Sequence, residues 1–145
     1  MTNSPLNEGT ALKDISIIFD LDGTLIDSVP DVCRALNRTL CPAGRRAHSV
    51  DEAKGYLGSG APILMQMAVE ATGGLKEGER LEDLTKAFLD DYAANPIVET
   101  TVFPHLFETL ALLGQQGARL AICTNKPSIT AAPVLDELDL TRYFG

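Results

Sequence analysis

Two aspartates one residue apart follow a short apolar run, and this pairing constrains the chain more than any other feature. Residues 15–20 are rich in Ile and end in Asp20, which favours a strand, and Asp22 and Gly23 follow. In an extended segment the two carboxylates project to the same side. Their repulsion and the cost of desolvating them predict that a metal ion, a shared proton or phosphate chemistry accounts for them. An Asp-Gly turn explains one aspartate but not the pair.

A second apolar run, over residues 118–124, ends in Thr124, and Asn125 and Lys126 follow. Such a short, continuously apolar run is typical of a parallel strand that is covered on both faces. Ligands of open α/β sheets bind beyond the carboxyl ends of the strands, so Thr124 is expected to lie close to Asp20. Helical patterns flank this run on both sides. The order of elements predicts an α/β fold with a doubly wound parallel sheet.

Residues 27–101, between the two strands, are predicted to form an insert of four helices. Each of four segments in it carries apolar residues at helical spacing. The first segment has Ser28 as its N-cap, and the second begins with a capping box, Ser49-Val50-Asp51-Glu52. Beyond the second strand, a further helix is expected to begin at Pro127-Ser128 and to bury Ile129.

This pattern divides the chain into an α/β core and a helical insert. The core is assigned residues 12–26 and 102–145, on either side of the insert at residues 27–101. Residues 1–11 are polar, contain Pro and Gly and have no apolar centre. They are therefore predicted to be a disordered lead-in and not a signal peptide.

Composition and charge limit the partners and the location that we expect. The net charge of −8 argues against a nucleic-acid partner, and no apolar run is long enough to cross a bilayer. The three cysteines have no ligand-like spacing and fit a reducing cytoplasm. His48 and His105 are expected to be structural or solvated, and Arg45 and Arg46 to be a charge pair in a loop. The pattern predicts no oligomeric state.

The two strand ends resemble the signature motifs of the haloacid dehalogenase superfamily. Asp20-Leu21-Asp22-Gly23-Thr24 is similar to the first motif, Asp-x-Asp-Gly-Thr, and Thr124 fits the second. The resemblance implies that Asp20 is a nucleophile that forms an aspartyl-phosphate, and that Asp22 is the general acid and base. The second aspartate is carried by the phosphatases and phosphomutases of the superfamily and is absent from its dehalogenases.

The same resemblance implies a cofactor, a phosphate site and a cap. The Asp20 carboxylate and the Asp22 main-chain carbonyl would hold Mg²⁺, and Thr124 and Asn125 would bind the phosphoryl oxygens. The helical insert would be a type-1 cap over a Rossmann-like core. Such a cap would exclude water and select the substrate.

Further segments resemble the phosphoglycolate phosphatases of this superfamily. The resemblance is carried by Phe103-Pro104-His105-Leu106, by Thr124-Asn125-Lys126-Pro127 and by the cap loop Gly58-Ser59-Gly60. It implies that the substrate is a small phosphorylated acid, 2-phosphoglycolate. In this cap loop, Gly58, Ser59 and Gly60 would present amides to the substrate, although an ordinary turn explains the glycines equally well. Met67 stands where the family commonly has an arginine, which leaves the substrate open.

Family members carry a later lysine and later acidic residues that complete the metal site, and these have no counterpart before Gly145. We therefore expect the chain to be the N-terminal part of a longer protein, with an incomplete core and one unpaired edge on the first strand. Lys126 is expected to be a poor replacement for the missing lysine. Two alternatives to a phosphatase stay open: a sugar phosphomutase, and a non-catalytic fragment that binds phosphate or metal.

Overall fold

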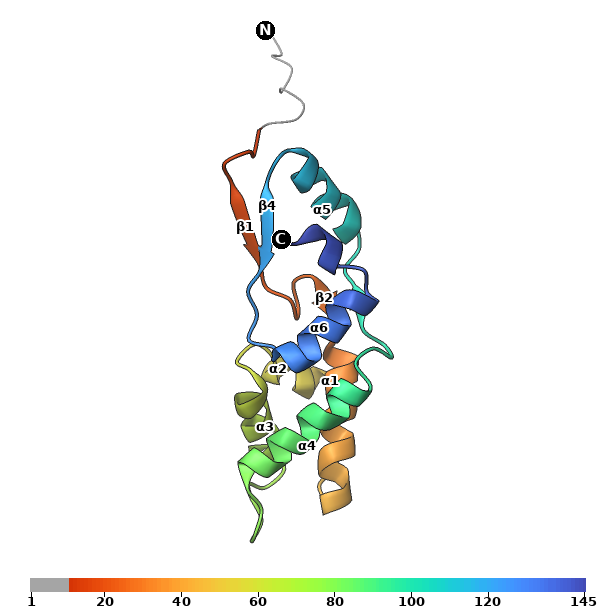
Figure 1. Cartoon of the computed structure of the whole chain (residues 1–145). Coiled ribbons are helices and arrows are strands. Elements are labelled where there is room, and N and C mark those ends of the chain that lie inside the picture. The colour runs from red at the N-terminus through yellow and green to blue at the C-terminus, as the bar shows by residue number, and fades with distance from the viewer. Residues whose placement is uncertain (1–10) are drawn as a thin grey trace, which may run out of the picture.

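Two separate clusters of buried side chains organise the structure, a computed structural model that describes residues 11–145. One cluster lies among helices between Val29 and Tyr92, and the other between Leu21 and Leu140, outside that insert. Figure 1 shows the strands β1 and β4 with helix α5 at one end of the molecule and the helices α1 to α4 at the other. The lead-in predicted for residues 1–11 lies, apart from Ala11, outside the described residues.

The core sheet is a parallel pair of strands, β1 (Ser16–Phe19) and β4 (Arg119–Ile122). Phe19 lies opposite Ile122, so both strands end at the same edge, and the Cys123 amide donates to the Phe19 carbonyl at 2.8 Å. Among residues 11–145, β1 has no second partner and the side chain of Ile18 is 67% exposed. The predicted unpaired edge is therefore confirmed.

The second strand was predicted to be buried on both faces, and the structure confirms this only in part. Leu120 of β4 is buried, but Ile122 is only half-buried and Arg119 is exposed. A strand becomes buried on both faces only when helices pack against each side of the sheet.

Two helices of the core follow the predicted positions, α5 (Leu106–Gln115) and α6 (Ser128–Glu137). Val134 of α6 is fully buried, but Ile129 is 59% exposed, so its predicted burial was wrong. The two residues are five positions apart, which separates them by about 140° around the helix axis. Only one of them can face the core. The short 3₁₀ helix η2 (Thr141–Tyr143) follows.

The insert contains all four predicted helices and a 3₁₀ turn, which pack around their own apolar cluster. Their bounds are α1 (Val29–Leu40), η1 (Cys41–Ala43), α2 (Val50–Tyr56), α3 (Ala61–Glu70) and α4 (Leu81–Ala94). The capping box at Ser49 and Glu52 is confirmed, with both reciprocal hydrogen bonds present. Over the part of the chain that the structure describes, no helix is long and apolar enough to cross a bilayer.

The chain passes between core and insert through a short antiparallel ribbon of β2 (Ile26–Asp27) and β3 (Thr101–Val102). Asp31, in the first turn of α1, secures the returning segment. Its carboxylate accepts hydrogen bonds from the amides of Val98 at 3.0 Å and of Thr100 at 2.8 Å. We propose that the boundary between core and cap, predicted at residues 27 and 101, runs through this ribbon.

Candidate active site

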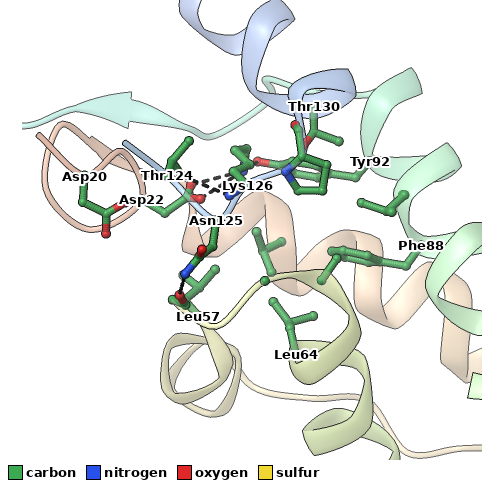
Figure 2. Close-up of a pocket in the computed structure, with 16 residues that line it drawn as sticks. Asp20, Asp22, Leu57, Leu64, Phe88, Tyr92, Thr124, Asn125, Lys126 and Thr130 are labelled. Carbon is green, nitrogen blue, oxygen red and sulfur yellow. Dashed lines mark hydrogen bonds and ion pairs between the residues drawn. The ribbon is translucent and has the colours of Figure 1, made fainter. Parts of the chain in front are cut away.

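Both sequence motifs meet in one pocket, at the carboxyl ends of β1 and β4 (Figure 2). The pocket spans about 480 Å³ and is open to solvent. Asp20, Asp22 and Thr124 line it from the core. Cap residues form the opposite wall, which is mainly apolar and includes Leu64 and Phe88. The predicted proximity of Thr124 to Asp20 is therefore confirmed.

Asp20 is the more accessible of the two aspartates. Its residue is exposed, and the amide of Leu21 donates to Asp20 Oδ1 at 2.8 Å. Among the described residues this is its one hydrogen-bond partner within the protein. A carboxylate that is fixed at one oxygen and open at the other can act as a nucleophile or a metal ligand.

Asp22 lies deeper, with a side chain that is 12% exposed. Its Oδ1 accepts a hydrogen bond from the Ser28 hydroxyl and one from Lys126 Nζ at 3.1 Å. Ser28 occupies the predicted N-cap position of α1, but its side chain makes no capping hydrogen bond. The hydroxyl is committed to Asp22 instead, and Asp27 Oδ1 accepts from the Val29 amide at 3.2 Å.

The sequence places Lys126 near the site, in the loop after the second strand, but does not predict its contacts with Asp22 and Tyr92. Its side chain is 5% exposed and lies between the core and the cap. Besides Asp22, Lys126 Nζ donates to the hydroxyl of Tyr92 on α4 at 3.0 Å and lies 4.4 Å from the centroid of that ring. In the sequence, Tyr92 belongs to an apolar helical stripe and Lys126 lies two residues after the predicted strand end at Thr124. Neither pattern predicts that the two side chains contact each other.

The contact with Lys126 also bears on the Tyr92 hydroxyl. Burial raises the pKa of Tyr92, and the neighbouring ammonium offsets part of that rise. The hydroxyl is therefore neutral at physiological pH and can accept the hydrogen bond from Lys126.

The second motif contacts the cap directly. Thr124 Oγ1 accepts from the Lys126 amide at 3.1 Å, which holds the turn after β4. Asn125 Nδ2 donates to the carbonyl of Gly58 at 2.7 Å, across the gap between core and cap. Gly60 also lies against this turn, since a Cβ added to it would stand 3.6 Å from the Asn125 carbonyl oxygen.

The cap loop enters the pocket only in part. Gly58 and Gly60 line the pocket, but Ser59 does not and is exposed. Both glycines have positive φ angles, +107° and +87°, which favour glycine at these positions. The path of the loop therefore turns the intervening Ser59 away from the site.

Comparison with known proteins places the chain in a family. A family model described as haloacid dehalogenase-like hydrolase matches residues 16–145. The chain belongs to this family. The match confirms that the two strand-end motifs are those of the haloacid dehalogenase superfamily.

Individual relatives include phosphoglycolate phosphatases from several bacteria. The phosphoglycolate phosphatase of Cereibacter sphaeroides is 35% identical over 128 residues, which cover 88% of this chain and 59% of the relative. That of Agrobacterium fabrum is 39% identical over 132 residues and is covered to 55%. A crystal structure of a predicted phosphoglycolate phosphatase from Haemophilus somnus superposes with a TM-score of 0.83 at 32% identity, covering 92% of this chain and 60% of the other. The chain thus spans little more than half the length of these relatives.

The oxygen atoms at the two aspartates are of the chemical type that binds Mg²⁺. Mg²⁺ takes oxygen ligands and is commonly held by one or two carboxylates together with water and substrate phosphate. The open Asp20 carboxylate supplies one such oxygen. No residue between 11 and 145 donates a hydrogen bond to the Asp22 main-chain carbonyl, which leaves it free to be a second. Within the same residues, no three His, Cys, Asp or Glu side chains form a metal cluster.

Proposed function

We propose that the protein is a phosphatase that hydrolyses small phosphomonoesters, with 2-phosphoglycolate as the substrate. The single observation that carries this proposal is the meeting of Asp20, Asp22 and Thr124 at the ends of two parallel strands, beneath a helical cap. The phosphoglycolate phosphatases among its relatives support the choice of substrate. Three free thiols are consistent with the reducing cytoplasm that we propose as its location.

In the first step Asp20 acts as the nucleophile. Its open oxygen attacks the phosphorus atom of the ester, and the bond from phosphorus to the alkoxide breaks as the aspartyl-phosphate forms. Asp22 then gives its proton to the leaving alkoxide, which departs as an alcohol. The exposure of Asp20 and the depth of Asp22 suit this division of roles.

In the second step Asp22 acts as a base. Its carboxylate takes a proton from a water molecule, which attacks the phosphorus atom and releases inorganic phosphate from Asp20. The bond that breaks joins phosphorus to the Asp20 oxygen, so the nucleophile and the protonated Asp22 are both regenerated. In both steps, the Thr124 hydroxyl and the main-chain amide of Asn125 would hold the phosphoryl oxygens.

Mg²⁺ is part of the proposal, held by the Asp20 carboxylate and the Asp22 carbonyl. When bound it would supply positive charge to the phosphoryl group, which the protein as a whole, at a net charge of −8, does not. The apolar side chains of Leu64 and Phe88 would exclude bulk water from the reacting atoms when the cap is closed.

Hydrolysis of 2-phosphoglycolate in the presence of Mg²⁺ tests the proposal. Phosphate release should fall by more than about 10³-fold in Asp20→Asn, because the nucleophile is lost. Asp14→Asn, an exposed aspartate just before β1, is the matched control and should keep the activity. Turnover that survives in Asp20→Asn, or that is indifferent to EDTA, would contradict the respective assignment. A requirement for a bisphosphate activator would point instead to a phosphomutase.

One observation favours a second candidate. Because the chain spans 59% and 55% of two relatives, it could bind a phosphate ester or a metal ion without turning it over. Assaying the 145-residue chain beside a version that is extended in frame separates the two cases. Binding without turnover by the chain alone, together with turnover by the extended protein, would support the second candidate.

A further inference from the structure

We propose that Lys126, positioned by Tyr92 of the cap, is the residue that selects substrates with a carboxylate on the carbon next to the ester oxygen. This inference rests on the proposed phosphatase function and assigns a specificity determinant within the same pocket. It is carried by the hydrogen-bonded chain from Tyr92 through Lys126 to Asp22.

Lys126 is the one cation among the described residues that line the pocket. Its ammonium contacts both carboxylate oxygens of Asp22, Oδ1 at 3.1 Å and Oδ2 at 3.4 Å, and donates to the Tyr92 hydroxyl at 3.0 Å. Figure 2 shows Lys126 between Asp22 and Tyr92, with Phe88 and Leu64 of the cap on the other side of the pocket. An anionic group that enters the pocket next to Asp22 therefore meets a single positively charged side chain among the described lining residues.

The surroundings of the ammonium favour an anionic ligand. The side chain of Lys126 is 5% exposed, and the Asp22 carboxylate is its acidic partner among the described residues. A buried ammonium is costly unless anionic groups contact it, so a substrate carboxylate beside Asp22 gains a favourable contact with Lys126.

The position of the ammonium sets where that carboxylate must lie. Lys126 Nζ is 3.1 Å from Asp22 Oδ1, the group that must reach the ester oxygen. A carboxylate on the adjoining carbon can thus contact Lys126 while the ester oxygen contacts Asp22. A carboxylate further along the chain would be carried toward the apolar wall at Phe88 and Leu64.

Tyr92 positions Lys126 from the cap. Its side chain is nearly fully buried in α4, and its hydroxyl and ring both contact the ammonium. The contact links the cap to the core, so the ammonium is held in place when the cap is closed. Tyr92→Phe keeps the ring and removes only the hydrogen bond, which should weaken the selection of a carboxylate without abolishing it.

Calorimetric binding of two esters tests the inference. All proteins carry Asp20→Asn so that turnover does not interfere, and 2-phosphoglycolate is compared with ethyl phosphate in the presence of Mg²⁺. With Lys126 intact, 2-phosphoglycolate should bind about tenfold to a hundredfold more tightly, the range of a hydrogen bond to a charged group. Lys126→Met should bring this ratio close to one, and Lys126→Gln should do the same. Lys86→Met removes an exposed positive charge from the same helix as Tyr92 and should keep the ratio.

The possible outcomes distinguish failure of the inference about Lys126 from failure of the proposed phosphatase function. Equal binding of both esters with Lys126 intact, or a preference that survives in both Lys126 variants, would overturn the inference and leave the phosphatase proposal standing. Failure of the protein to bind either ester would overturn the proposed function, and the inference with it. Circular dichroism of each variant establishes that a lost preference does not reflect a lost fold.

Discussion

The helical cap and the α/β core complete their packing to different degrees. In the cap, four helices enclose one apolar cluster in which Leu36, Met65 and Ala68 are fully buried. In the core, β1 has one partner among the described residues, and Ile15 and Ile18 remain 47% and 67% exposed. A helix satisfies its backbone hydrogen bonds internally, whereas a strand needs a neighbour at each edge.

The difference in packing matters for the candidate site, because one side of the pocket comes from the core and the other from the cap. The carboxylates of Asp20 and Asp22 follow the less supported strand, and Thr124 follows its partner. The well-packed cap provides the apolar wall and the hydroxyl of Tyr92, which contacts the one cation in the described pocket lining. The helical insert thus contributes to the electrostatics of the site as well as to its wall.

The largest stability effect is expected inside the cap, at Arg45. Its guanidinium is fully buried, pairs with Glu79, and donates to the Gly74 carbonyl at 2.8 Å and to Thr72 Oγ1 at 3.1 Å. Arg45→Ala leaves these acceptors unpaired and should lower the free energy of unfolding by about 3 to 5 kcal/mol. Urea denaturation followed by circular dichroism measures it.

Arg46→Ala is the matched control for this prediction. Arg46 pairs with Glu52 at 2.7 Å on the surface, and that pairing holds the pKa of Glu52 at about 2. Solvent screens such an exposed pair, so its loss should cost much less than the loss of Arg45. Equal effects of the two substitutions would show that the cap does not depend on the buried guanidinium.

An intermediate effect is expected at Asp31, where the cap meets the segment that returns to the core. Burial alone would raise the pKa of Asp31, but hydrogen bonds from the Thr100 side chain and from the amides of Val98, Glu99 and Thr100 outweigh it and lower the pKa below 3.8. Asp31→Asn sets an amide N–H against backbone donors, and should cost about 2 to 3 kcal/mol near neutral pH.

The pH dependence of this contribution has a definite sign. A carboxyl group whose pKa is lower in the folded state stabilises the fold above its unfolded pKa and loses that effect as the pH falls through the folded pKa. The difference in unfolding free energy between wild type and Asp31→Asn should therefore be constant above about pH 5. It should shrink progressively as the pH falls through 3.8 and then through the lowered pKa of the folded state. A difference that grows in acid would contradict the hydrogen-bond account.

The smallest effect is expected on the open side of the core sheet. Ile18→Thr on β1 should change the unfolding free energy by less than about 0.5 kcal/mol, because the side chain is already exposed. Leu120→Ala on the paired strand β4, where the side chain is 7% exposed, should cost about 2 to 5 kcal/mol. If both substitutions cost the same in thermal melts, β1 is covered in solution and the contrast with the cap is wrong.

Local sequence signals predicted much of this architecture. The capping box at Ser49, the helical stripes of the insert and the two apolar strands lie within short windows, and the structure has each of them. Pairing of the two strands in parallel followed from the continuously apolar second run and from the order of strands and helices along the chain. It correctly brought Thr124 to the same edge as Asp20.

The contacts that cross between core and cap could not be predicted in this way. Ser28 was expected to cap α1 and instead donates to Asp22, because the fold brings that carboxylate within reach. Within the cap, Arg45 was expected to belong to a charge pair in a loop. It does lie in a loop, but its side chain is fully buried and pairs with Glu79, 34 residues further along the chain. The pairing of Lys126 with Tyr92 joins residues 34 positions apart, and no periodic pattern encodes such a contact.

Transfer of the phosphoryl group to Asp20 tests the central claim most directly. The protein is mixed with Mg²⁺ and isotopically labelled phosphate ester, quenched in acid, digested and analysed by mass spectrometry. The account predicts labelled phosphate on the peptide that contains Asp20 and none in Asp20→Asn, because that variant lacks the nucleophile. Phosphate release by the wild type with no label on that peptide, or label that persists in Asp20→Asn, would contradict it.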